Sequence, residues 1–364
     1  MPSFNLISAD SHVYEPGDLW QKYTDPKFKD KAPRLVQQNG EDRLVADWGL
    51  NSSPGMGVSA GKKPEDVKLG GTYAAGRQGA WDPDQRIKDM AEDGVDAEVL
   101  FPTVSMSLYH CPDRELLMAM FKAYNDWMVD FCATKPNQLV GVGVVSLDDM
   151  QAVAEETKRV AQKGLRGIMV QAEPTPDRPF GHPTLYDPFW AAAQETGLPV
   201  SLHTFAGPVR SVETADWCVT YSVATAQIQK SIAALIFSGV FERFPDLTVV
   251  SVENDVSWAP NFMERMDHAY NRHRFWAGTQ LKSGKLPSQF FKDHIKMTFI
   301  RDQAAAVTRH IIGLDSLFWS SDYPHADTSW PESRALVDKQ FAGMPEAELR
   351  QITRDNTIKL YHLN

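Results

Sequence analysis

The sequence predicts an α/β fold, a (β/α)8 TIM barrel with an inserted lid or subdomain after its first strand. Eight short runs rich in Val, Ile, Leu or Phe alternate with helical patterns. The runs show little polar alternation, which is typical of parallel strands buried on both faces. The 364 residues are 43% hydrophobic, which suits a single barrel domain over residues 1–364. A doubly wound open sheet is the alternative.

The predicted elements follow one another along the chain with few interruptions. In chain order, the strands cover residues 4–10, 96–102, 139–145, 165–171, 198–203, 247–253, 295–300 and 317–322. An Asp-Pro pair starts the first helix of the barrel and Gly follows the ends of two others, as helix boundaries favour. The predicted helices cover 82–93, 112–135, 148–164, 184–197, 223–245, 256–275, 302–313 and 346–361.

Residues 23–81 do not fit this alternation. The segment is rich in Gly, Lys and Ser, and we expect it to form an insertion that lies over the mouth of the barrel as a lid or subdomain. Gly55 and Gly57 form a G-x-G pattern, but no strand precedes it and no helix follows it. The pattern therefore does not predict a dinucleotide site.

The composition excludes several classes of partner. A net charge of −10 argues against binding to nucleic acid or to an anionic membrane. Three cysteines far apart in the chain predict no disulfide framework, and no secretory signal or membrane-spanning run is recognisable. We therefore expect a cytoplasmic protein that acts on a small molecule.

Polar side chains stand at the carboxyl ends of the predicted strands, where a TIM barrel places its chemistry. Asp10 and His12 are two residues apart, so they point to the same side of a strand. His203, Glu253 and Asp322 end the fifth, sixth and eighth predicted strands. Two imidazoles and three carboxylates form a ligand set for zinc, manganese or iron, with one or two ions per chain.

Other residues near the strand ends suggest further roles. His325, three residues beyond Asp322, is expected to assist catalysis or to bind a second ion. Arg301 ends the seventh strand and is a candidate substrate clamp, because arginine pairs with carboxylates in a bidentate way; a salt bridge is the alternative. Phe205 and Trp258 belong to a group of aromatic residues that predicts an apolar pocket for an aromatic or hydrophobic substrate.

Six segments across most of the chain share the patterns of one family: ADSHVYEP, DPDQRIKDMAEDGVDAEVLFPT, SLHTF, VENDVSWAP, SSDYPH and DNTIKLYHL. Together they resemble the amidohydrolase-related family, in the branch of aminocarboxymuconate semialdehyde decarboxylase and the γ-resorcylate-type decarboxylases. The resemblance implies a TIM-barrel metal enzyme in which Asp10, His12, His203 and Asp322 bind the metal. It also favours a homodimer, with the helix near 256–275 as a candidate interface.

Two positions depart from those decarboxylases. Asp10 stands where they usually carry His or Glu, and Glu253 stands where they carry a catalytic His. We therefore expect hydrolysis by metal-activated water, with Asp322 or Glu253 moving the proton and Glu253 as a further metal ligand. Zinc is the expected ion. Non-oxidative decarboxylation and oxygenation by a pair of iron ions are the alternatives.

Overall fold

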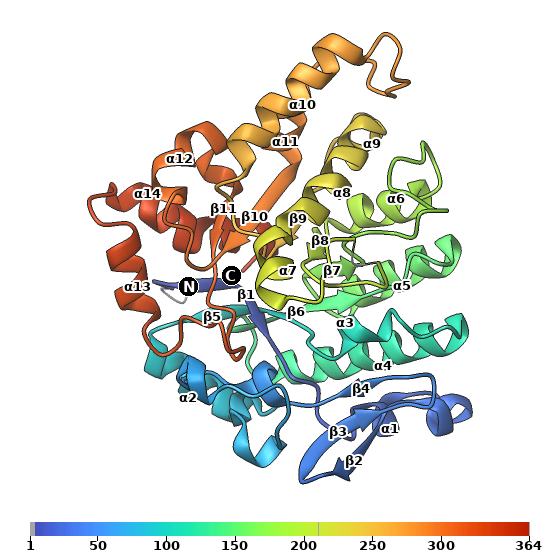
Figure 1. The fold of residues 1–364 in the computed structure, drawn as a ribbon, viewed down its shortest axis with the longest axis vertical. Helices are drawn as coiled ribbons and strands as arrows, with labels where there is room; N and C mark the ends of the chain where they lie inside the picture. Colours follow the sequence, from blue (N-terminus) through green and yellow to red (C-terminus); the bar gives the residue numbers. More distant parts are fainter. Residues whose placement is uncertain (1–3, 210, 364) are drawn as a thin grey trace.

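The centre of the protein is a ring of eight parallel strands surrounded by helices (Figure 1), seen in a computed structural model that describes residues 4–209 and 211–363. The strands are hydrogen-bonded in chain order, from β1 through β5 to β11. Their bounds are β1 Ile7–His12, β5 Ala97–Phe101, β6 Leu139–Val144, β7 Gly167–Val170, β8 Val200–His203, β9 Val249–Val252, β10 Ile295–Phe299 and β11 Leu317–Trp319. Each overlaps a predicted strand, and the predicted (β/α)8 barrel is confirmed.

The ring is nearly closed by contacts between β1 and the chain that follows β11. The amide of Asp322 donates to the carbonyl of Asp10 at 2.9 Å, and the amide of His12 donates to the carbonyl of Tyr323 at 2.6 Å. The amide of Ser321 donates to the hydroxyl of Ser8 at 2.9 Å. This seam brings the two ends of the sequence together and sets two predicted metal ligands side by side.

The helices cover the outside of the ring. The predicted start of α2 (Pro83–Asp93) is correct, because the Asp82 carboxylate caps the amides of Asp84 and Gln85. The other helices are α1 Leu19–Tyr23, α3 Ser105–Leu108, α4 Arg114–Ala133, α5 Met150–Gln162, α6 Asp187–Thr196, α7 Trp217–Val223, α8 Thr225–Phe237, α9 Val240–Arg243, α10 Ala259–His273, α11 Pro287–His294, α12 Ala305–Ile312, α13 Ser333–Gln340, α14 Glu346–Arg350 and α15 Asn356–Tyr361.

Two long predicted helices are divided in the structure. The helix predicted over 223–245 is α8 and α9, separated where Gly239 adopts φ +72°, a left-handed conformation that glycine adopts without steric cost. The preceding α7 starts before the predicted helix, because Asp216 caps the amides of Cys218 and Val219. The last predicted helix, 346–361, contains a π-helical turn between α14 and α15.

The segment between β1 and α2 contains structure that the sequence did not predict. Three short strands, β2 Arg34–Gln38, β3 Glu41–Val45 and β4 Asn51–Ser52, form a separate antiparallel sheet. This sheet lies at the edge of the molecule, beside α1 (Figure 1). The Tyr73 hydroxyl donates to the carbonyl of Glu15 at 2.7 Å and connects the segment to the chain just after β1.

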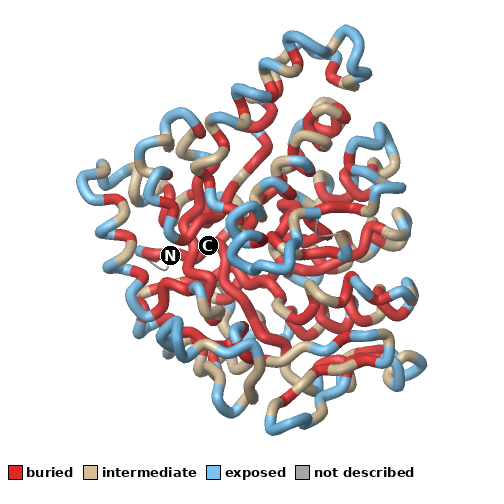
Figure 2. Tube along the Cα trace, viewed as in Figure 1, coloured by how far each residue is buried: buried red, intermediate tan, exposed pale blue. Residues whose placement is uncertain are grey.

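The pattern of burial matches this arrangement of strands inside and helices outside. Figure 2 shows buried residues concentrated in the strands and exposed residues on the outer helices and loops. Every residue of β1, β5 and β6 is buried, including polar ones. Across the described part of the chain, no helix combines the length and apolar character needed to cross a bilayer.

Candidate metal centre

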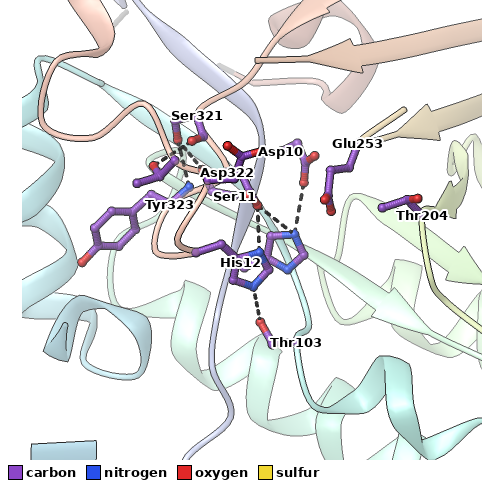
Figure 3. A network of polar contacts seen from close by, with 12 residues as sticks. Asp10, Ser11, His12, Thr103, Thr204, Glu253, Ser321, Asp322 and Tyr323 are labelled. Atoms are coloured by element: carbon purple, nitrogen blue, oxygen red, sulfur yellow. Dashed lines mark hydrogen bonds and ion pairs between the residues drawn. The ribbon is translucent and has the colours of Figure 1, made fainter. Parts of the chain in front are cut away.

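Three predicted ligands converge at the carboxyl ends of β1 and β8. The side chains of Asp10, His12 and His203 are fully buried. The Nε2 atoms of His12 and His203 are 3.0 Å apart. Oδ1 of Asp10 lies 3.5 Å from Nε2 of His12 and 3.7 Å from Nε2 of His203. Figure 3 shows Asp10 and His12 beside Asp322 and Tyr323, which follow β11.

Asp322 and His325 extend the cluster from that loop. Oδ1 of Asp322 lies 3.5 Å from Nε2 of His12 and 3.0 Å from Nδ1 of His325. The imidazole of His325 stacks on that of His12, with ring centroids 4.0 Å apart. Asp10, His12 and His203 form one triad of candidate ligand atoms, and His12, Asp322 and His325 form a second.

The hydrogen bonds of His12 and His203 fix which nitrogen faces the cluster. Nδ1 of His12 is 2.8 Å from the carbonyl of Pro102, and Nδ1 of His203 is 2.9 Å from the carbonyl of Thr204. A carbonyl oxygen only accepts, so each Nδ1 carries a proton. In the neutral rings the Nε2 lone pairs of His12 and His203 therefore face one another, which is the arrangement of metal-binding histidines.

Thr103 orients His325 in the same way. Its hydroxyl donates to the carbonyl of Val13 at 2.8 Å, so the Thr103 oxygen accepts from Nε2 of His325 at 2.9 Å. Nε2 of His325 therefore carries a proton, and in the neutral ring the lone pair of Nδ1 lies on the side of Asp322. Figure 3 shows Thr103 at the lower end of this network.

The carboxylates supply the matching anionic atoms. Oδ1 of Asp10 and Oδ1 of Asp322 are buried and accept no hydrogen bond within the described residues. Unpaired buried carboxylate oxygens are costly, and here they lie beside two imidazole lone pairs. A cation would satisfy all of these atoms at once, and a mixed nitrogen and oxygen set is one that divalent transition metals accept. The residues present therefore fit a divalent metal ion.

The pKa shifts of the residues in the cluster arise from burial and from the titratable groups packed around each of them. Burial and the nearby Asp10 raise the pKa of Asp322 well above its usual range, and burial and Asp322 do the same for Glu253. Burial and the neighbouring His325 lower the pKa of His12 to about 3. Burial opposes a charge on His203, but Asp10 and Glu253 together raise its pKa to about 9. These carboxylates are ionised together only when positive charge lies among them.

Glu253 stands at the edge of the cluster, at the end of β9. Its Oε2 lies 3.7 Å from Nε2 of His203. Its amide donates to the hydroxyl oxygen of Thr298 at 2.9 Å, and that hydroxyl donates to Oδ2 of Asp10 at 3.3 Å. Glu253 and Asp322 both have left-handed backbones, with φ of 59° and 55°. Such strained non-glycine residues cluster at functional sites.

A pocket of about 710 Å³ opens above the cluster. Asp322, His325 and Glu253 form part of its floor. The remaining lining comes from the chain just after β1, from the insertion, from the segment after β5, from residues 204–222 and from the loop after β11. Those further lining residues are Tyr14, Asn51, Ser52, Ser53, Met56, Gly57, Leu69, Thr103, Met106, Ser107, Thr204, Phe205, Trp217, Cys218, Tyr221, Ser222, Ala326 and Asp327.

The three predicted substrate contacts lie in different places. Phe205 lines the pocket. Arg301 lines a neighbouring cavity of about 240 Å³ and donates to the carbonyls of Asp327 and Thr328. Trp258 is not among the described lining residues of either cavity; its Nε1 donates to the carbonyl of Asn254 at 2.8 Å.

Two residues of the site were missed from the sequence. Thr103 follows the second predicted strand, so the strand-end rule that selected His203 would also have selected it. Thr298 lies within β10, and nothing in the sequence marks it. The rule locates Thr103 but gives it no role, and Thr298 does not stand out because threonine is common in strands.

The model of the amidohydrolase family matches residues 16–363. The chain is 25% identical over 192 residues to 2-amino-3-carboxymuconate-6-semialdehyde decarboxylase of Dictyostelium discoideum, which is 52% of each chain and hence about half of that relative. It is 24% identical over 299 residues to γ-resorcylate decarboxylase of Rhodococcus jostii (strain RHA1), covering 77% of this chain and 88% of the relative.

Three solved structures share the fold over almost the whole chain. An amidohydrolase from Mycobacterium avium subsp. paratuberculosis K-10 has a TM-score of 0.81 at 23% identity, covering 99% of this chain and 100% of the other. The 5-carboxyvanillate decarboxylase of Sphingomonas paucimobilis has a TM-score of 0.72 at 19% identity, covering 100% of both chains. A dihydroxybenzoic acid decarboxylase from Polaromonas sp. JS666, with bound manganese and 2-nitroresorcinol, has a TM-score of 0.67 at 16% identity, covering 100% and 98%.

The comparisons overturn the hydrolysis expected from the sequence. Both curated relatives are decarboxylases, so they favour the first alternative over the main expectation. A glutamate at position 253 does not by itself decide between hydrolysis and decarboxylation. A carboxylate 3.7 Å from the imidazole of a candidate ligand can move a proton in either chemistry.

Proposed function

Because the chain belongs to the amidohydrolase family, we propose that it is a divalent-metal-dependent decarboxylase of aromatic carboxylic acids. The observation that carries the proposal is the floor of the pocket. There, two unpaired carboxylate oxygens and two imidazole lone pairs meet below a cavity of about 710 Å³. The decarboxylase relatives support the choice of reaction.

The reaction we propose breaks the bond between a ring carbon and the carboxylate carbon. The electron pair stays on the ring carbon, CO₂ leaves, and a proton replaces it. A bound divalent metal would supply Lewis acidity and orient the acid group. Asp10, His12, His203 and Asp322 hold the ion in this proposal. Glu253 borders both the ligands and the pocket, so it delivers the proton.

The hydrogen bonds favour one ion per chain. The two candidate triads share His12, whose Nδ1 is committed to the carbonyl of Pro102. Its single remaining lone pair can bind one metal, so the triads are not two independent sites. We propose zinc or manganese as the resident ion, because both accept nitrogen and oxygen ligands.

Release of ¹³CO₂ from carboxyl-labelled hydroxybenzoic acids tests the reaction, with the arene product measured in parallel and dioxygen excluded. We expect equal amounts of CO₂ and arene, lost on chelation and restored by manganese or zinc. Plasma mass spectrometry of the wild type and of Glu253→Gln measures the metal content and tests whether Glu253 is a proton donor or a metal ligand. A variant that keeps one metal ion but loses turnover makes Glu253 the proton donor, and one that loses the ion makes it a ligand. Absence of CO₂ release from every acid rejects the proposal.

We also propose a cytoplasmic homodimer. All three cysteines are free, as expected in a reducing compartment. Phe275 and Trp276 follow α10 and are 80% and 75% exposed, and Val307 and Ile311 on α12 are also exposed. Large exposed apolar side chains mark interaction surfaces. Sedimentation velocity tests this, and Trp276→Ser is expected to shift the protein towards the monomer.

A further inference from the structure

Exposed apolar side chains gather at the mouth of the pocket. Four of its lining residues, Met56, Leu69, Trp217 and Tyr221, are 39%, 82%, 51% and 44% exposed. We call these four residues the apolar rim. Solvent-facing apolar groups of this size are costly to leave in water, and where they are contiguous they mark a binding surface.

Two segments far apart in sequence form the apolar rim. Met56 and Leu69 come from the insertion, whereas Trp217 and Tyr221 come from α7. The second pair is held in place over the pocket. The Trp217 ring packs against Phe205, with centroids 5.2 Å apart, and the Tyr221 hydroxyl donates to Oδ2 of Asp327 at 2.7 Å.

The rim continues into the pocket, whose lining reaches the proposed ligand Asp322 and its neighbours Glu253 and His325. A single benzene ring with one acid group fills only part of a pocket of about 710 Å³. A ligand whose acid group reaches the floor therefore leaves the rim in water unless it carries an apolar extension. This continuity favours a ligand of the pocket over a second protein as the occupant of the rim.

The charges of the pocket favour an uncharged extension. Its lining includes the carboxylates of Glu253, Asp322 and Asp327, and the described lining residues include no lysine or arginine. Arg301, in the neighbouring cavity, donates to the carbonyls of Asp327 and Thr328. A second anionic group on the ligand would meet carboxylates without gaining an ion pair.

Building on the proposed decarboxylase function, we propose that the substrate is an aromatic acid that carries an uncharged apolar extension. The acid group lies at the metal ligands, and the extension lies against the apolar rim. Leu69 and Trp217, the two most exposed members of the rim, are then specificity-determining residues that contact the substrate but take no part in the bond cleavage.

Binding of two nitro compounds to the manganese-loaded full-length protein tests this by calorimetry. The compounds are 2-nitroresorcinol and 4-hexyl-2-nitroresorcinol, whose nitro group stands in for the carboxylate and cannot leave as CO₂. We expect the hexyl compound to bind at least about tenfold more tightly, as burial of about two methylene groups implies. Leu69→Ser and Trp217→Ser should reduce this gain to below about threefold and leave binding of 2-nitroresorcinol within about twofold.

Val219→Ser is the matched control, because Val219 is 47% exposed on α7, the helix that carries Trp217, and does not line the pocket. This variant should keep the full gain in affinity that the hexyl chain gives to the wild type. A third compound with a carboxylate at the end of the hexyl chain should lose most of the gain. No gain in the wild type, or a gain that survives both rim substitutions, overturns the proposal.

The binding measurement does not depend on turnover. If the gain depends on the rim but no acid releases CO₂, the proposed reaction fails and the inference about the extension stands. If Leu69→Ser or Trp217→Ser instead changes the sedimentation coefficient and leaves the gain intact, the rim is a contact between copies of the chain and the inference fails.

Discussion

The floor and the rim of the pocket are built in opposite ways. The floor lies on Asp10, His12 and His203, which are fully buried and belong to strands of the barrel. At the rim, Leu69 and Trp217 are 82% and 51% exposed and belong to an inserted segment and a short helix. The difference suggests that the barrel sets the chemistry, whereas the segments added to it select the ligand.

The physical reason lies in how each part is held. His12 and His203 each donate one ring proton to the carbonyl of a residue just after a strand, Pro102 or Thr204, so these hydrogen bonds fix their orientation. The rim side chains are 39% to 82% exposed, and in our proposal a ligand buries them. Substitutions of the proposed metal ligands should therefore abolish metal binding and turnover, whereas those at the rim should change only which substrates bind.

The largest effect should come from Asp10→Asn. It keeps the size of the side chain and removes a buried anionic ligand. We expect metal affinity to fall by more than about 100-fold, beyond the loss seen for outer partners of metal ligands, and turnover to vanish with it. Plasma mass spectrometry after dialysis against a chelator measures this. Asp84→Asn, at an exposed carboxylate, is the control. If Asp10→Asn kept its full metal content, Asp10 would not be a metal ligand.

The position of the candidate metal centre was largely predictable from the sequence, because short-range patterns mark most of its residues. The two-residue spacing of Asp10 and His12 places both on one face of a strand, and the end of a predicted strand locates His203 and Asp322. Burial of both faces made the strands recognisable as unbroken apolar runs.

The rim was expected only in outline, as an insertion and aromatic residues near the mouth of the barrel, and the supporting contacts were not predictable in this way. The sheet β2–β3–β4 has mainly exposed or half-buried residues, so it lacks a clear apolar pattern. Leu69 lies in a Gly- and Lys-rich stretch that suggests only a loop. The role of Thr103 depends on a tertiary contact with His325, which no local pattern encodes.

Arg86→Met should cause the next largest effect, on stability. Arg86 is completely buried; its Nε lies 2.5 Å from Oε2 of Glu98, and its Nη1 donates to the carbonyl of His12 at 2.5 Å. Removing one partner of a buried ion pair leaves the other charge without compensation, so the free energy of unfolding should fall by about 3–5 kcal/mol. Urea denaturation measures the loss.

Arg159→Met is the control for this change. Arg159 pairs with Asp126 and Glu156, but its side chain is 23% exposed, so we expect a loss of about 1 kcal/mol or less. Equal losses in both variants would mean that the ion pair beneath His12 does not stabilise the floor more than a surface pair does.

Thr103→Val should have an intermediate effect. Valine keeps the shape of threonine but cannot accept a hydrogen bond from Nε2 of His325. The ring therefore loses its fixed orientation beside Asp322. We expect kcat to fall by about 10- to 100-fold, as for other partners that orient metal-site histidines, with the metal retained. Thr103→Ser restores the hydroxyl and should stay within about threefold of wild type. Loss of activity in both variants would indicate a packing role instead.

Arg301→Gln should have the smallest effect, and it separates two interpretations of that residue. The sequence suggested that Arg301 clamps the substrate, whereas the structure shows it donating to the carbonyls of Asp327 and Thr328. Asp327 in turn accepts from Tyr221 of the rim. Because Arg301 is 45% exposed, loss of these contacts should raise KM by no more than about fivefold, and only for acids that carry an apolar extension. A rise in KM of about 100-fold for every acid would match a direct charged hydrogen bond from Arg301 to the substrate carboxylate. Arg301 would then be a substrate-binding residue, as the sequence suggested.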